Sequence, residues 1–214
     1  MKRILFFLLT IVLLTGCNKT KNKLLFSGQI YSPNEDKNLA NITVELQAQI
    51  IETGTYNSNF QLLQKVTTDG EGKYNITNDN VRASVFKLIA YANDYIRTES
   101  EINSDLVTVG KTYNHNFNLY SKAYLMIYVH NTAPADSTDE ITISVIHSSP
   151  NCSVCCDISN AVFTGVINDT LNCLVYGNQT VKVDYTVNTS SNFHHYSHNV
   201  YCPAFETETF SINY

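Results

Sequence analysis

Apolar and polar residues alternate in short runs along the chain from residue 24 onward, with turn-forming stretches between the runs. In the run 42–48, Ile42, Val44 and Leu46 fall on one face of an extended strand, and the intervening polar side chains fall on the other. This period of two predicts half-buried β-strands. In the first half of the chain we expect strands at 24–31, 41–50, 60–67, 72–77, 83–91, 95–102 and 112–120.

The second half of the chain continues this pattern. Val181 and Val183 share one face of the run 179–188, with Lys182 and Asp184 on the other face. The stretch 188–205 is rich in histidine, serine and asparagine and is interpreted as a long connecting segment. Further strands are expected at 123–131, 139–148, 161–169, 171–177 and 206–214.

These strands predict an all-β protein of two tandem antiparallel β-sandwich domains, at residues 24–121 and 122–214. Seven strands in about 98 residues suit a two-sheet sandwich, and a chain of that length suffices for one core. The strands on either side of residue 121 are only a few residues apart, so the linker is very short.

The first 16 residues have the parts of an export signal. Lys2 and Arg3 precede an apolar block from Ile4 to Leu14 that only Thr10 interrupts. Such a block reaches about 16 Å as a helix, whereas a bilayer core is about 30 Å thick. We therefore interpret residues 1–16 as a signal peptide that is removed from the mature protein.

The signal ends in Leu14-Thr15-Gly16-Cys17, which resembles the lipobox of bacterial lipoproteins. The resemblance implies a diacylglyceryl thioether on Cys17, cleavage before it, and acylation of the new amino terminus. Two or more acyl chains give a stable membrane anchor. Residues 17–23 would then be a lipidated tether, and Asn18 after the cysteine favours the outer membrane as its location in the cell envelope. An ordinary secretory signal beside an unrelated cysteine is the alternative.

Charge argues against nucleic acid as a partner. Without residues 1–16 the chain keeps 12 basic and 19 acidic residues, a net charge of −7. Nucleic acids and anionic membrane surfaces both attract clusters of Lys and Arg. The membrane contact is therefore expected through the lipid on Cys17.

Two motifs in the first domain resemble the carboxypeptidase regulatory-like domain, a transthyretin-like sandwich. The first motif is Gly28 in the first strand, followed by Leu39 to Val44 where the chain enters the second strand. The second motif leads into a later strand and consists of Thr67 or Thr68, Asp69, Gly72 and Tyr74. The resemblance spans about residues 24–121 and implies a spacer or binding platform. It implies no peptidase activity, because in that family the zinc ligands and the base belong to a separate catalytic domain.

The turn at 69–72 has a structural explanation of its own. Asp69 can accept hydrogen bonds from its own turn, and glycine accepts a positive φ, so the stretch predicts a hairpin. A calcium loop would need oxygen ligands at alternate positions and a distal Glu, which this stretch lacks.

All cysteines except the anchor lie in the second domain. Outside the cytoplasm disulfides are the expected state, and five cysteines allow at most two bridges and leave one thiol. We expect the run 152–156 to be bonded to Cys173, Cys202 or both, with its two adjacent cysteines taking different partners. The disulfide candidates are Cys152, Cys155, Cys156, Cys173 and Cys202.

A metal site formed by the cysteine run and the histidines is the alternative, with free thiols a third. His194 and His198 would lie about 13 Å apart on a strand, too far for one metal, and His195 and His198 could converge only on a bent segment. A zinc ribbon would also need a second Cys-x-x-Cys, which is missing. We therefore expect no metal and no cofactor.

Catalytic signatures are absent from the sequence: it has no Gly-x-Ser-x-Gly, no His-Glu-x-x-His and no phosphate-binding glycine loop. Glu206 and Glu208 alternate as on any solvated strand. The sequence thus favours a non-enzymatic module that binds or adheres to glycan or peptide. The alternative is a structural or assembly accessory of a cell-envelope complex, with the sandwiches as spacers.

Overall fold

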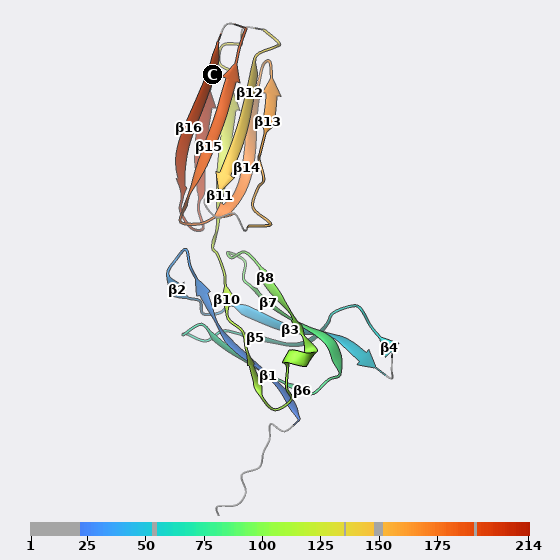
Figure 1. Cartoon of the computed structure of the whole chain (residues 1–214). Coiled ribbons are helices and arrows are strands. Elements are labelled where there is room, and N and C mark those ends of the chain that lie inside the picture. Colours follow the sequence, from blue (N-terminus) through green and yellow to red (C-terminus); the bar gives the residue numbers. More distant parts are fainter. Residues whose placement is uncertain (1–21, 53–54, 135, 148–151, 191) are drawn as a thin grey trace, which may run out of the picture.

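The computed structural model of the chain describes residues 22–214 except 53–54, 135, 148–151 and 191. Two β-sandwich domains follow one another along the chain (Figure 1), as the alternating pattern predicts. The all-β fold class is thereby confirmed. The expected signal peptide and Cys17 lie outside the described residues.

The first sandwich packs two five-stranded sheets against each other. Their facing residues form one hydrophobic cluster in which Phe26, Ile30, Leu46, Tyr74 and Leu88 are fully buried. One sheet contains β1 (Lys23–Ser32), β2 (Lys37–Asn38), β6 (Lys73–Asp79), β9 (Thr112–Asn114) and β10 (Phe117–Asn118). The other contains β3 (Thr43–Glu52), β4 (Thr55–Tyr56), β5 (Gln61–Thr67), β7 (Ala83–Tyr91) and β8 (Thr98–Asn103), and the short 3-10 helix η1 (Ser104–Leu106) follows β8.

The second sandwich has a three-stranded and a four-stranded sheet, with a separate hydrophobic cluster that includes Leu125, Ile127, Ile143 and Val183. The smaller sheet has the order β14 (Asn168–Tyr176), β11 (Lys122–His130), β17 (Thr207–Asn213). The larger has the order β13 (Ala161–Thr164), β12 (Glu140–His147), β15 (Gln179–Asn188), β16 (Phe193–Cys202).

Both sandwiches are antiparallel except where the first and last strands of a domain meet. In the first domain β1 runs parallel to β9 and β10, with Leu25 opposite Thr112 and Ile30 opposite Phe117. In the second domain β11 runs parallel to β17 over seven residue pairs. Each domain is thus closed by pairing its beginning with its end.

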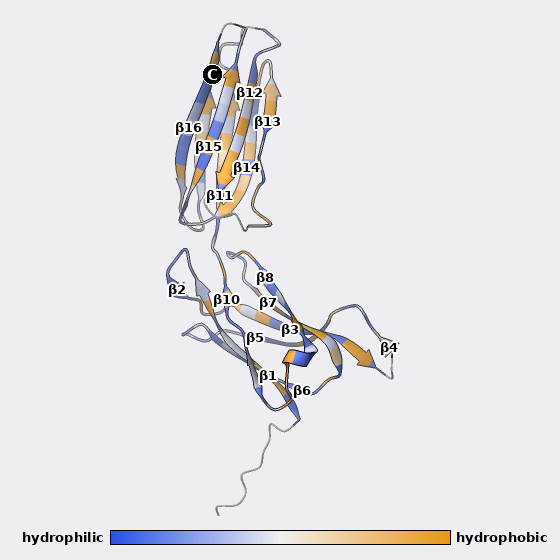
Figure 2. Cartoon of the chain, viewed as in Figure 1, coloured by the Kyte–Doolittle hydropathy of each residue, from blue (hydrophilic) through white to orange (hydrophobic). Residues whose placement is uncertain are grey.

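The sequence interpretation is wrong for the stretch 188–205. Its central part is not a connecting segment but the ten-residue strand β16, which pairs with β15 along its whole length. Figure 2 shows β16 hydrophilic along most of its length, whereas β12 and β14 are more hydrophobic. An edge strand that is exposed on both faces needs no apolar alternation, so periodicity does not detect it.

Two other expected strands are interrupted. His115 and Asn116 separate β9 from β10, and a turn at Gly165, with φ of 71°, separates β13 from β14. In the described part of the chain no helix has the length and apolar character needed to cross a membrane.

The chain turns at 69–72 as predicted, but the turn does not close a hairpin, because β5 pairs with β3 in one sheet and β6 pairs with β1 in the other. The Asp69 carboxylate accepts hydrogen bonds from the backbone N–H groups of Glu71, at 2.9 Å, and Lys73, at 2.8 Å. Gly72 has φ of 74°, the left-handed conformation that glycine adopts without strain. Both hydrogen bonds go to Oδ1 of Asp69, so this carboxylate stabilises its own turn.

The junction between the sandwiches is held by polar contacts. The Asn34 amide donates to the Ser121 hydroxyl, at 2.6 Å, and to the Gly177 carbonyl, at 2.7 Å. The rings of Tyr120 and Tyr176 stack across the junction with centroids 4.3 Å apart. The short linker is thus braced by side chains from both domains.

Candidate functional site

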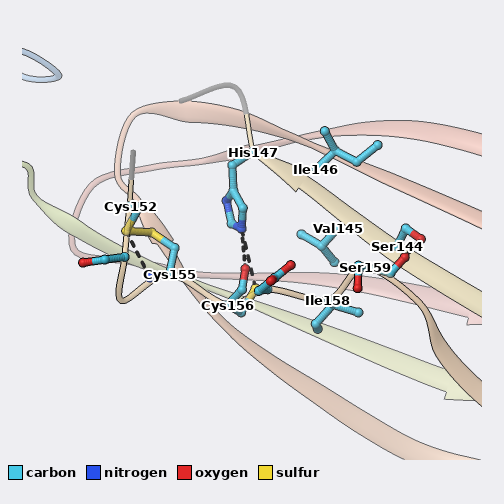
Figure 3. A pocket seen from close by; sticks show the side chains of 11 residues that line it. Ser144, Val145, Ile146, His147, Cys152, Cys155, Cys156, Ile158 and Ser159 are labelled. Atoms are coloured by element: carbon cyan, nitrogen blue, oxygen red, sulfur yellow. Dashed lines mark hydrogen bonds between the residues drawn. A yellow bond between two sulfur atoms is a disulfide. The ribbon is translucent and has the colours of Figure 1, made fainter. Parts of the chain in front are cut away.

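The cysteine run forms a disulfide-bonded loop after β12, beside a pocket of about 620 Å³ (Figure 3). Cys152 bonds Cys155 within the loop, and Cys156 bonds Cys173 on β14. The Cys156 N–H also donates to the Leu174 carbonyl, at 3.0 Å, so the loop runs along the edge of β14. The pocket wall is therefore fixed covalently to the smaller sheet.

His147 faces this loop from the end of β12 (Figure 3). Its Nε2 lies 2.7 Å from the Cys156 carbonyl oxygen, which can only accept, so Nε2 carries the hydrogen and donates. The sulfur of Cys156, 3.8 Å from the same nitrogen, is already in a disulfide. His147 therefore orients the loop here, and that nitrogen is not free to act as a base.

The observed pairing differs in part from the sequence expectation. Cys155 and Cys156 take different partners, and one bond reaches Cys173, but Cys152–Cys155 closes within the run itself. A metal site would require these sulfur atoms as thiolates. Among the described residues no three His, Cys, Asp or Glu side chains gather as a metal site.

Cys202, a disulfide candidate by sequence, is instead a free thiol. It ends β16 inside the hydrophobic cluster, fully buried, while Cys173 is already bonded to Cys156. Burial, with a smaller contribution from the nearby Glu208 charge, raises the pKa of the Cys202 thiol to about 11.

This pKa predicts a protected thiol. Since the thiolate is the reactive form, Cys202 should resist iodoacetamide at pH 8 in the folded protein and react once the protein is unfolded in urea. Mass spectrometry of the alkylated peptides measures both states. Rapid labelling of Cys202 in the folded protein would contradict its burial.

A row of aromatic rings lies along the inward face of β16 and its neighbours. Tyr185 on β15 stacks on Tyr196, with centroids 4.9 Å apart, and on His198, at 5.8 Å. His194 extends the row beyond Tyr196, and Phe210 on β17 continues it beyond His198. We call these five residues the ring row.

The ring row is accessible because β16 and β17 do not close the edge of the sandwich. Tyr196 remains 40% exposed, and both histidines of the row are exposed. A groove of about 300 Å³ beside the row is lined by Tyr185, His194, Tyr196 and the carboxy-terminal Tyr214. Flat rings next to hydroxyl, imidazole and amide groups can stack on a ligand and hydrogen-bond to it without any formal charge.

The histidines do not converge. His194 and His198 lie on the inward face of β16 with Tyr196 between them, and His195 lies on the outward face opposite Thr186. In the sequence these histidines suggest metal ligands, and nothing there points to a row of stacked rings. The turn signal Thr-Ser-Ser-Asn after β15, followed by Phe and Tyr, is the sequence feature from which the second strand of a hairpin could have been expected.

The first 18 residues of the chain match a known protein signature. The signature of the prokaryotic membrane lipoprotein lipid attachment site matches residues 1–18. The chain therefore carries a lipoprotein attachment site. It is a lipid-anchored protein of the cell envelope.

Solved structures similar to this chain are remote in sequence. The Bacillus anthracis TIE protein is 11% identical with a TM-score of 0.37, over 90% of this chain but only 34% of its own, so this chain spans about a third of it. The shaft pilin SpaA from Lactobacillus rhamnosus GG is 8% identical, with a TM-score of 0.32, over 88% of this chain and 97% of the pilin. A streptococcal ancillary pilin is 12% identical, with a TM-score of 0.35, over 89% and 62%. Among curated proteins none matches this chain.

Proposed function

We propose that this lipoprotein is a non-catalytic binding and adhesion module whose ligand is a glycan or peptide. The ring row on β16 carries the proposal, because it places partly exposed aromatic rings beside a groove in the second domain. This domain lies at the opposite end of the molecule from the start of β1, the first strand after the anchor in sequence (Figure 1). A ligand site there would face away from the membrane.

The two domains have separate roles in this proposal. We assign residues 24–121 to a carboxypeptidase regulatory-like spacer on the motif around Gly28 and Asp69, and residues 122–214 to the ligand-binding domain. Outer-membrane attachment is proposed from Asn18 after Cys17. The braced junction at Asn34 favours the second candidate function, a spacer within an envelope complex, because it holds the domains end to end.

Ligand binding is tested by applying the detergent-extracted lipoprotein to glycan and peptide arrays. Tyr196→Ala should abolish binding to any array ligand, because it removes the centre of the ring row. Tyr128→Ala is the matched control, since Tyr128 is 41% exposed and lies on β11, away from the row. Equal loss in both variants, or no array ligand at all, would favour the spacer function.

Cys17→Ser should abolish processing after Gly16 and lipidation. The protein should then move from the detergent phase to the aqueous phase in Triton X-114 partition, because it loses the acyl chains that hold it in the membrane. Gel mobility reports the uncleaved signal. A variant that matures normally and stays with the detergent would show that Cys17 is not the anchor.

A further inference from the structure

The free edge of β16 differs from the other edges of its sandwich. β13 is only four residues long, the cystine loop runs along β14, and β17 carries Glu208. Short strands, covering loops and charged residues are the usual means by which proteins protect a sheet edge from further pairing. Each of these three edges has one of them.

β16 has none of them. It is ten residues long, contains no proline, aspartate, glutamate, lysine or arginine, and pairs with β15 alone among the described strands. Seven consecutive residues from Phe193 are exposed, on both faces of the strand. Large rings lie at both ends of the outward face, where Phe193 is 69% and Tyr201 54% exposed. Such an edge can accept another strand.

The hairpin fixes which backbone groups are free. Thr189 and Asn192 exchange both of their backbone hydrogen bonds across the turn between β15 and β16. Hydrogen-bonded and non-bonded pairs alternate along an antiparallel ladder, so the even-numbered residues of β16 bond to β15. The backbone N–H and C=O groups of residues 193, 195, 197, 199 and 201 therefore point away from β15, in the plane of the sheet, toward its free edge.

The five residues with free backbone groups can pair with the same five residues of a second copy. In an antiparallel pair of β16 strands centred on Ser197, Phe193 faces Tyr201 and His195 faces Asn199. All five residues in each copy then donate and accept, which gives about ten hydrogen bonds. On the other face Tyr196 lies opposite His198, so rings pair on both faces and no histidine lies directly opposite another.

We propose that β16 pairs with β16 of a second copy of this chain, and that the two copies are anchored in opposing membranes. A strand without Asp, Glu, Lys or Arg brings none of these charges against its copy, although the mature chain is acidic overall. The opposing arrangement follows from symmetry: an antiparallel pair turns the second copy end for end, and the strands of the second domain run along the length of the molecule (Figure 1). The proposal rests on the adhesion function and adds a partner to it.

Two double variants test the register. His195→Lys with Asn199→Lys places lysine opposite lysine twice in the proposed pair and should abolish the dimer. His195→Lys with Asn199→Glu places opposite charges at the same two positions and should preserve it. Within one strand the two positions are about 13 Å apart. Residue 199 also lies opposite Lys182 on β15 of its own copy, so Asn199→Lys and Asn199→Glu as single variants measure the effect of that contact on folding.

The readouts are analytical ultracentrifugation of the lipoprotein in detergent and light scattering by phosphatidylcholine vesicles that carry it. The unchanged protein should dimerise and aggregate the vesicles, and so should a control with Asn168→Lys and Asn172→Lys, which has the same spacing on the exposed part of β14. Circular dichroism and thermal melting establish that each variant folds.

Several results would overturn the proposal. The unchanged protein could be a monomer at every concentration, the two double variants could behave alike, or dimers could form without vesicle aggregation. A monomer that still binds array ligands would refute self-pairing alone and leave the proposed function standing. Capture of other extended peptides by a monomeric protein would assign the β16 edge to a different partner.

Discussion

Gly28→Ala is expected to destabilise the first domain by about 3 kcal/mol, near the upper end of overpacking effects. A Cβ at this position would lie 1.7 Å from the His115 carbonyl oxygen and 2.8 Å from the Tyr74 ring. His115 cannot easily move, because its N–H donates to the Ser27 carbonyl at 2.8 Å and its carbonyl accepts from the Tyr74 hydroxyl at 2.6 Å. Urea unfolding monitored by circular dichroism measures the loss.

Gly70→Ala provides the matched control. Gly70 has open space where its Cβ would stand, with no heavy atom within 4 Å, so the free energy of unfolding should change little. Similar unfolding midpoints for the two variants would mean that the approach of His115 to β1 is not as tight as the structure has it.

Removing the Cys156–Cys173 bond should give the other large loss of stability. The bond closes a loop with a sequence separation of 17, and the chain-entropy model gives about 3 kcal/mol for such a closure. Cys173 is also fully buried, so Cys156→Ala with Cys173→Ala removes core packing as well. The urea midpoint of the second domain measures the effect.

The Cys152–Cys155 bond offers the comparison, because it spans a sequence separation of only 3. The same model gives about 2 kcal/mol for so short a loop, so Cys152→Ala with Cys155→Ala should cost less. Peptide mapping of the unreduced protein should find both bonds. A larger loss from the shorter loop, or a bond to Cys202, would contradict the observed pairing.

The strands that could be predicted from sequence are those with one buried face. Val44 and Leu46 on β3, and Val181 and Val183 on β15, alternate with polar residues because one side of each strand contacts the core. β16 gives no such signal over residues 193–199, since the inward side chains there line an open edge, and only Val200 and Cys202 at its end reach the core. Periodicity therefore missed the strand that carries the candidate site, as it missed the two-residue strands β2 and β4.

The cysteines illustrate a second limit of sequence reasoning. Their number and the compartment predict disulfides, but the partners depend on the tertiary arrangement. Cys173 is available to Cys156 because the Cys156 N–H donates to the Leu174 carbonyl on β14. Cys202 stays free because the other four described cysteines pair with one another. Gly28 shows the same limit. The sequence identifies it as a motif residue, but the reason for a glycine there is the close approach of the His115 carbonyl, 87 residues further along the chain.

The parallel pairing of first and last strands has a mechanical consequence. A pull between the lipid anchor and the second domain enters the first domain at β1 and leaves it after β10, two neighbouring strands that run in the same direction. The hydrogen bonds that join β1 to β9 and β10 are then loaded in shear, and they must break together instead of peeling apart one at a time. The first domain can thus bear tension along its length between the anchor and the second domain.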